Sequence, residues 1–182
     1  MEDELRNALD RTTEEFSLEG KVLRAKVVSL YDADTCRVVF HLNNTLVKYT
    51  VRMVGIDTPE MRPSRSNPDR LKEKRAAKIA RNRMAQFLTN APIELMGSYT
   101  KSQFQDLIDK NTRIIDLHAK EFDKYGRLLA LLYDSENDSK SANERLVEEG
   151  YALSYDGGTK GSFNWEQYPN LGNTTDESSD ED

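Results

Sequence analysis

Five strand-like segments, a long helix between the third and the fourth of them, and a short helix after the fifth predict an α+β protein. Short turns connect the first three segments into a meander, and the other two follow the long helix. This order of elements is typical of a small closed barrel. We therefore predict an OB-fold, a five-stranded Greek-key β-barrel with packed helices.

The first three strands are predicted over residues 21–30, 35–42 and 45–56, which contain many β-branched side chains. The polar residues between the first two strands are typical of a turn, and Asn43-Asn44 is a hairpin signal. Pro59 should end the third strand, because proline cannot donate to a strand ladder. Carboxylates therefore stand at the ends of neighbouring strands.

The long helix is predicted over residues 71–88, where apolar side chains recur at helical spacing. Its other faces are rich in lysine and arginine, and we interpret them as solvated. A short strand is expected over 93–96 and a helical turn over 102–109.

The last two strands are predicted over residues 113–118 and 128–133. Ser141 is the expected N-cap of a final helix that ends at Glu149, before Gly150.

The chain divides into three parts by composition. Residues 1–19 form an acidic N-terminal extension, in which apolar spacing predicts a helix over 3–15. Residues 20–156 form the folded domain. Residues 157–182 form a Gly/Ser-rich and acidic tail, with Phe163, Trp165 and Tyr168 as possible anchors and with disorder expected from residue 174.

The net charge of −6 conceals a basic middle. Residues 1–19 hold seven acids and two arginines, and residues 171–182 hold five acids, so each end carries −5. The remaining residues therefore hold 24 basic and 20 acidic side chains, a net +4. A basic body suits a phosphate-rich partner, although an ordinary surface would show the same modest excess.

Composition also argues against a membrane-spanning, a secreted or a disulfide-bonded protein. No apolar run is long enough to span a bilayer, and the acidic N-terminus lacks the pattern of a secretory signal, so we expect an intracellular protein without a membrane partner. The single cysteine, Cys36, excludes an internal disulfide.

The charged residues at the strand ends form a candidate catalytic set. Asp34 and Asp57 would repel each other unless a cation lies between them, and oxygen-only ligands favour Ca²⁺ or Mg²⁺. Glu60, just beyond, is placed to take a proton from water. Arg52 and Arg127 match phosphate oxygens and would stabilise a five-coordinate phosphorus. Such a set suits metal-assisted hydrolysis of phosphodiesters.

Four blocks of the sequence, residues 32–35, 51–60, 123–130 and 143–152, resemble in this order the staphylococcal nuclease (thermonuclease) family. The resemblance covers about Gly20 to Tyr155. It implies an OB-fold nuclease that depends on Ca²⁺ and cleaves DNA and RNA to leave 3′-phosphate ends.

The resemblance also implies a role for each matching residue. Asp34, Asp57 and the carbonyl of Thr58 would hold the ion, and Glu60 would be the general base. Arg52 and Arg127 would bind the phosphate. The expected substrate-binding residues are Lys124, Tyr125 and Tyr155. We expect DNA and RNA to be taken as single or locally unpaired strands, by a monomer.

Three departures from the family pattern bear on these expectations. Ala33 replaces a glycine between two aspartates, which would disfavour a positive φ and alter ion affinity. An insertion around 97–112 is expected to reshape one rim of the groove, and residues 157–170 lack the family's final helix.

Two other functions remain open. A domain of the same fold can bind nucleic acid without cutting it, and the barrel with its acidic ends can serve protein interaction. The acidic ends would also compete with nucleic acid for the basic body.

Overall fold

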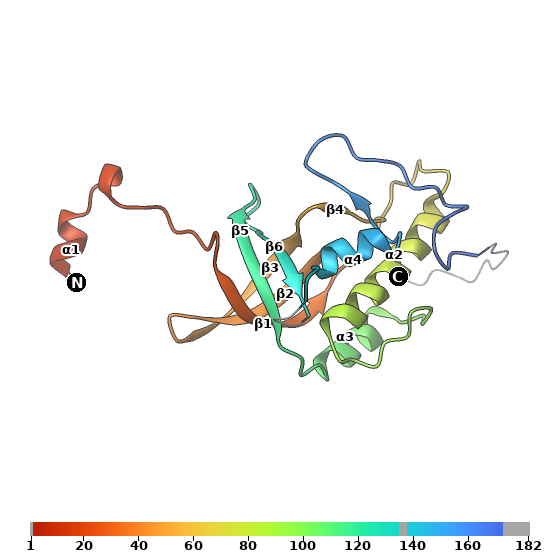
Figure 1. The fold of residues 1–182 in the computed structure, drawn as a ribbon, viewed down its shortest axis with the longest axis horizontal. Helices are drawn as coiled ribbons and strands as arrows, with labels where there is room; N and C mark the ends of the chain where they lie inside the picture. Colours follow the sequence, from red (N-terminus) through yellow and green to blue (C-terminus); the bar gives the residue numbers. More distant parts are fainter. Residues whose placement is uncertain (1, 135–137, 173–182) are drawn as a thin grey trace.

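The computed structural model describes residues 2–134 and 138–172, and its centre is a closed five-stranded barrel (Figure 1). The barrel strands are β1 (Val22–Leu30), β2 (Thr35–Leu42), β3 (Thr45–Met53), β5 (Ile115–Phe122) and β6 (Leu128–Tyr133). Their order around the barrel is β1-β2-β3-β6-β5, with β3 and β6 parallel and the other pairs antiparallel. This topology confirms the predicted OB-fold.

The predicted third strand is interrupted near its end. A turn at Val54–Gly55, in which Gly55 has a φ of +79°, separates β3 from the two-residue strand β4 (Ile56–Asp57). β4 pairs with β7 (Leu153–Ser154) instead of continuing in the barrel. The turn therefore carries Asp57 away from the barrel wall and toward the C-terminal segment.

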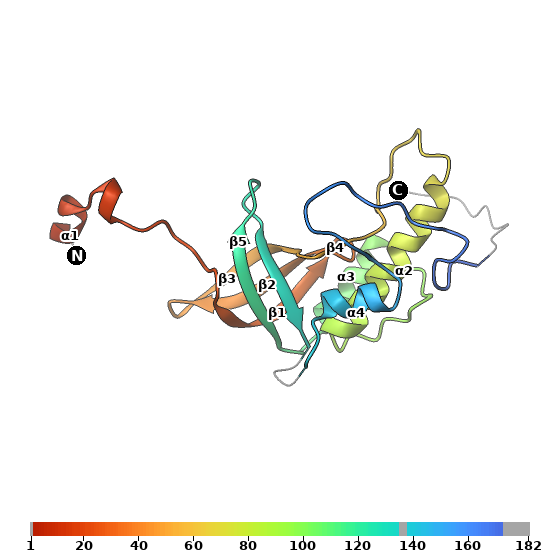
Figure 2. The same cartoon turned by 45° about the horizontal axis from the view of Figure 1, so that its top comes forward.

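Three helices cover one end of the barrel (Figures 1 and 2). They are α2 (Arg70–Leu88), α3 (Lys101–Asp109) and α4 (Ala142–Glu148). Capping boxes start α3 at Thr100 and α4 at Ser141, so the predicted cap at Ser141 is confirmed.

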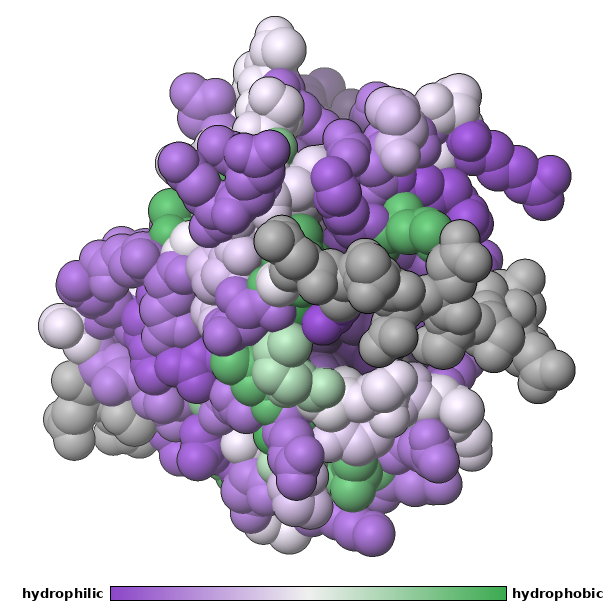
Figure 3. Space-filling view, turned by 90° about the vertical axis from the view of Figure 1, so that its right-hand side faces the viewer, coloured by the Kyte–Doolittle hydropathy of each residue, from purple (hydrophilic) through white to green (hydrophobic). Residues whose placement is uncertain are grey.

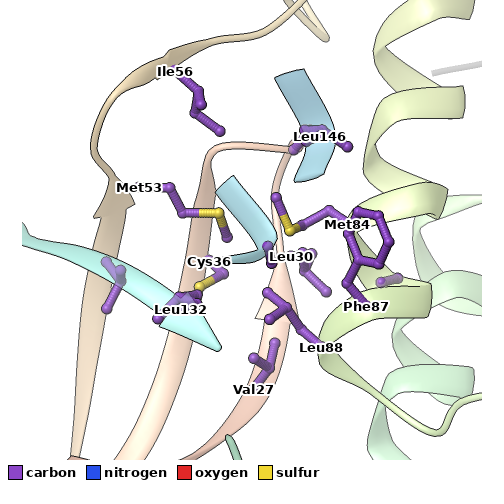
Figure 4. Close-up of a cluster of buried hydrophobic side chains, with 14 of the residues drawn as sticks. Val27, Leu30, Cys36, Met53, Ile56, Met84, Phe87, Leu88, Leu132 and Leu146 are labelled. Carbon is purple, nitrogen blue, oxygen red and sulfur yellow. The ribbon is translucent and has the colours of Figure 1, made fainter. Parts of the chain in front are cut away.

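The core joins the barrel to these helices. Met84, Phe87 and Leu88 of α2 point toward Leu30 on β1, and Leu146 of α4 lies beside them (Figure 4). The cluster also contains Cys36, which is the free cysteine of the chain and is buried.

The basic faces of α2 are less solvated than predicted. Arg81 is buried, and its guanidinium lies 3.8 Å from the centre of the Phe104 ring. Arg83 makes two hydrogen bonds to the carboxylate of Glu149, at 2.6 and 2.7 Å. These arginines hold α2 against α3 and α4, so they are not free for a polyanion.

The strand expected over 93–96 is absent from the described part of the chain. The side chain of Asn82 donates to the carbonyls of Glu94, Leu95 and Gly97, at 2.9 to 3.2 Å. Because the Asn82 side chain satisfies the hydrogen-bonding capacity of these backbone carbonyls, they do not have to pair with a neighbouring strand.

The insertion packs as α3 beneath the barrel. Its Phe104 and Ile108 are buried, and Gln105 donates to the carbonyl of Val28, where β1 bulges between Val27 and Ser29. Helix α3 thus supports the strand that leads into the turn at 31–34.

The helix predicted over 3–15 is wrong in length. The chain forms only α1 (Glu2–Asn7) and a 3₁₀ turn at Asp10–Thr12, and Leu5 and Leu9 are exposed. A helix without a packed apolar face is marginal in water, which accounts for the short element. The ring of Phe16 lies 6.1 Å from that of Phe122 and ties the extension to β5.

The segment after β7 crosses the helical end without forming a helix, as the departure from the family pattern predicted. Tyr168 is buried, and its hydroxyl donates to the carbonyls of Tyr151 (2.9 Å) and Ala76 (3.3 Å). The rings of Phe163 and Trp165 stack at 5.2 Å beside it, so all three predicted anchors pack together. The acidic tail from 174 lies outside the described residues.

The surface at this end is mostly hydrophilic, with apolar side chains in small separate patches (Figure 3). None of the helices among the described residues has the length and apolar character that crossing a membrane requires.

Candidate active site

The turn at 31–34 is built by its own carboxylates. Asp32 accepts a hydrogen bond from the backbone N–H of Asp34 at 3.2 Å, so Asp32 forms the turn, as its sequence context suggested. Asp34 is buried and accepts from the hydroxyl of Thr35 at 3.0 Å. Ala33 is buried and is not among the residues with positive φ, so the expected backbone conflict at this position does not arise.

Arg52 links this turn to the end of β3. Its guanidinium forms an ion pair with the Asp34 carboxylate and donates to the carbonyls of Asp34 and Ile56, each at 3.3 Å. Residue Thr35 pairs with Arg52 across β2 and β3, which sets this geometry. The arginine therefore holds two strand ends together on the outer face of the barrel.

Thr58 completes the link from the other side. Its hydroxyl donates to Oδ2 of Asp34 at 2.9 Å, and both Thr58 and the preceding Asp57 are buried. The structure thus brings together Asp34, Arg52, Asp57 and Thr58, which the sequence placed 24 residues apart at most.

Glu60 lies at the rim of this group. Its side chain is half exposed, and its backbone N–H donates to Glu73 of α2 at 3.1 Å. The side chain of Asn67 donates to the other oxygen of Glu73, so α2 positions the loop that carries Glu60.

A residue that the sequence did not indicate also enters the site. The ammonium group of Lys160 lies 2.8 Å from Oδ1 of Asp57 and donates to Oε1 of Glu60 at 3.2 Å. The close contact with the Asp57 carboxylate raises the pKa of Lys160. No spacing or motif in the Gly/Ser-rich stretch around Lys160 points to these acids, which lie about a hundred residues earlier in the chain.

Arg127 lies on a neighbouring turn. Asp123 accepts from the backbone N–H groups of Tyr125 and Arg127, both at 2.9 Å, and from Nε of Arg127 at 2.6 Å. Burial alone would raise the pKa of Asp123, but the hydrogen bonds from Arg127 and Tyr125 lower it below its ordinary value. Asp123 therefore shapes the turn and orients the arginine.

The register of β3 and β6 places this turn near Arg52. Arg52 is opposite Leu129 in the parallel pair, and Arg127 is two residues before Leu129, so both arginines lie on the outer face of the barrel. The contacts of Arg127 are with Asp123 and the Tyr125 ring, and none joins it to the acids in the described structure.

The candidate substrate-binding residues flank the two arginines. Tyr125 is 72% exposed, and the Lys124 ammonium lies 5.1 Å from the centre of its ring. Tyr155 follows β7, and its backbone N–H donates to the carbonyl of Gly55 at 3.0 Å. Tyr155 therefore lies beside the turn that precedes Asp57.

Negative charge accumulates in the buried turn. Burial, followed by the charge of Asp34, raises the pKa of Asp32 to about 7. Burial lowers the pKa of Arg81 to about 10, against the opposing effect of the Asp32 charge. The carboxylates of Asp32 and Asp34 thus lie close together in a buried turn, where an added positive charge would be stabilising.

The donors at the two strand ends are all oxygen atoms, which suits a hard cation such as Ca²⁺. Asp34 and Asp57 are both buried, so a cation there would be shielded from water. Within residues 2–134 and 138–172, however, no three His, Cys, Asp or Glu side chains are grouped to hold a metal. A cation held between these strand ends would have two carboxylate ligands and would need backbone or water oxygens for the rest of its coordination.

A protein-family model matches most of the chain. Residues 50–180 match the family model described as "Staphylococcal nuclease homologue". No curated protein matches the chain.

Proposed function

Because this chain belongs to the staphylococcal nuclease family, we propose that it is a calcium-dependent nuclease that hydrolyses phosphodiester bonds of DNA and RNA with little sequence preference. The observation that carries the proposal is the link between the two strand ends, where Thr58 and Arg52 both bind Asp34 next to Asp57. Asp34, Arg52 and Asp57 lie together at these strand ends. Glu60 lies at their rim, and Arg127 lies on the neighbouring turn.

Each residue has a defined task in the proposed reaction. Asp34, Asp57 and the carbonyl of Thr58 would hold Ca²⁺, which when bound supplies positive charge for the phosphate and for water. Glu60 takes a proton from the attacking water, since its side chain is half exposed at the rim.

Arg52 and Arg127 bind the phosphate oxygens and stabilise the added charge as phosphorus becomes five-coordinate. The bond from phosphorus to O5′ then breaks, and the leaving 5′-alkoxide takes a proton from water, so that the products are a 3′-phosphate and a 5′-hydroxyl.

The exposed Tyr125 ring supports single or locally unpaired strands as the preferred substrates. A tyrosine that is 72% exposed beside Lys124 offers a stacking surface for a base together with a positive charge for the backbone. Tyr155 would contact the substrate on the other side of the site. We further propose that the chain acts as a monomer inside the cell, with residues 20–156 as its catalytic domain.

A second candidate is a nucleic-acid-binding module that does not cut. The contact of Lys160 with both Asp57 and Glu60 favours it, because the acids needed for hydrolysis are already paired with an ammonium group. Binding without cleavage would then use Arg127, Lys124 and Tyr125 alone.

A cleavage assay separates the two candidates. The purified chain is incubated with single- and double-stranded DNA and RNA, with Ca²⁺ or with a chelator. We expect cleavage with Ca²⁺ only and about a hundredfold or greater loss in Glu60→Ala, the range expected for removal of a general base. Equal cleavage by Glu60→Ala would contradict the mechanism, and binding without cleavage under any ion would favour the second candidate.

A further inference from the structure

Lys160 is the basic residue that bridges the proposed base and a proposed ion ligand. Its ammonium lies 2.8 Å from Asp57 and 3.2 Å from Glu60. The side chain of Lys160 is 51% exposed, whereas that of Asp57 is only 6% exposed. The lysine thus reaches from the surface to a carboxylate that is otherwise closed to solvent.

The segment that carries Lys160 is held at both of its ends. At the start, the backbone N–H of Tyr155 donates to the carbonyl of Gly55. At the far end, the buried Tyr168 hydroxyl donates to Tyr151 and Ala76. In Figures 1 and 2 this segment, drawn in blue, stands out from the helical end beside the chain that leads from β4 to α2.

Between these anchors the chain is exposed and rich in glycine. Every residue from 156 to 162 is exposed, and three of the seven are glycines, of which Gly157 has a φ of +97°. We name residues 156–162 the Lys160 loop. Because its own side chains are not packed into the core, the loop can move while both anchors stay in place.

The ammonium and a metal ion would compete for the same oxygen. A calcium ion binds carboxylate oxygens at about 2.3–2.6 Å. An ammonium at 2.8 Å from Oδ1 of Asp57 would then be a second cation in close contact with the ion. Only one of the two cations can occupy this position, and the singly charged ammonium offsets half of the charge of Asp57 and Glu60, whereas a divalent ion would offset all of it.

We propose that Lys160 is a built-in competitor of the metal ion. In the closed loop its ammonium pairs with Asp57 and Glu60, and binding of a divalent cation displaces it and opens the loop. This inference rests on the proposed function, since it takes Asp57 as an ion ligand. The pairing of Lys160 with the acids would inhibit an intracellular nuclease until a rise in the concentration of the cation displaces the lysine.

Calcium affinity tests the competition. Calorimetric titration of the full chain with Ca²⁺ compares the wild type with Lys160→Met and with Lys140→Met. The control is matched in exposure, because Lys140 is 54% exposed, and its ion pair is with Glu148 of α4 and not with either proposed site acid. If the closed loop is populated about nine-tenths of the time, Lys160→Met should bind Ca²⁺ about tenfold more tightly. The control should bind as the wild type does.

Hydrogen exchange tests the movement without any measure of activity. Amide exchange in peptides that cover 156–162 should accelerate on addition of Ca²⁺ in the wild type. In Lys160→Met the exchange should be fast with or without the ion.

The possible failures are distinct. If all three proteins bind Ca²⁺ equally and exchange in 156–162 does not change, the competitor role is overturned while the proposed ion site stands. If Lys160→Met binds Ca²⁺ more weakly, Lys160 supports the ion and the competitor role is overturned as well. If no protein binds Ca²⁺, both the ion site and the competitor role are wrong.

Discussion

At the scale of single residues, Arg52 has a structural task in addition to its proposed catalytic one. It is mostly buried and joins Asp34 to the carbonyl of Ile56, whereas Arg127 is a third exposed and binds Asp123 on its own turn. Removal of Arg52 should therefore destabilise the fold more than removal of Arg127, although both arginines are proposed to bind phosphate.

Arg52→Ala should lower the free energy of unfolding by about 3–5 kcal/mol, because the buried Asp34 loses its ion-pair partner. Arg127→Ala should lower it by about 1 kcal/mol or less, since its ion pair is partly exposed. Urea denaturation followed by circular dichroism measures both. Equal losses of stability would contradict the assigned difference in burial.

The pH dependence of stability depends on Asp32. Its pKa is about 7 in the folded protein, against an ordinary 3.8, so the folded state binds more protons between these values. Stability therefore falls as pH rises through this interval. In chelator, Asp32→Asn should be more stable than the wild type at pH 8, by at most about 4 kcal/mol. The difference should vanish toward pH 4.

The control for this prediction is Asp3→Asn in the exposed helix α1. Urea denaturation at several pH values should give this control the same pH profile as the wild type. A profile of Asp32→Asn that runs parallel to the wild type would show that Asp32 ionises normally.

Local patterns predicted the candidate site residues but not their partners in the structure. Asp34, Arg52, Asp57 and Glu60 lie at strand ends, which periodicity and Pro59 locate from the sequence. Lys160 is in a loop whose path depends on the anchoring of Tyr168 against α2, a tertiary contact that leaves no local signal. The pairing of Asp57 and Glu60 with Lys160 was therefore not predictable.

At the scale of elements, one buried side chain attaches α4 to the site. Asn143 donates to the carbonyls of Val54 (2.8 Å) and Ala130 (3.2 Å) and accepts from the N–H of Leu132. Helix α4 thus fixes the turn between β3 and β4, on which the position of Asp57 depends.

Asn143→Ala should cost about 1–3 kcal/mol of stability, because it leaves buried backbone groups without partners. The exposed Asn7→Ala should change stability by less than about 0.5 kcal/mol. Thermal denaturation of both variants checks this, and a stable Asn143→Ala would mean that α4 is held by its apolar contacts alone.

Helices and strands were predictable where the pattern of hydrophobic residues continued over many residues, as in α2 and the barrel strands. The failures occurred where a single side chain decided the outcome. Asn82 donates to the backbone carbonyls of the segment after Ile93, which would otherwise be free to pair in a strand. Gly55, with its positive φ, ends β3 in a turn before Asp57. Neither effect follows from propensity.

At the scale of the whole molecule, the acidic ends surround a basic middle. Helix α1 buries none of its residues, and residues 2–15 are all exposed, so this part of the extension contributes little to folding. Removal of residues 2–15 should leave the melting temperature unchanged, as differential scanning calorimetry can verify. A large fall would show that the extension packs on the barrel.

The acidic ends bear on binding through charge. Trimming of both ends should raise affinity for a single-stranded oligonucleotide at low salt, with a smaller effect at high salt because exposed charges are screened. Fluorescence anisotropy measures this, and unchanged affinity would exclude competition by the ends.

The central claim is that two strand ends form one cation site beside a base. Calorimetric titration with Ca²⁺ of the wild type, Asp57→Asn and Glu60→Gln tests it most directly. We expect one ion per wild-type chain, loss of binding in Asp57→Asn and retained binding in Glu60→Gln. Absence of binding in the wild type, or unchanged binding in Asp57→Asn, would contradict it.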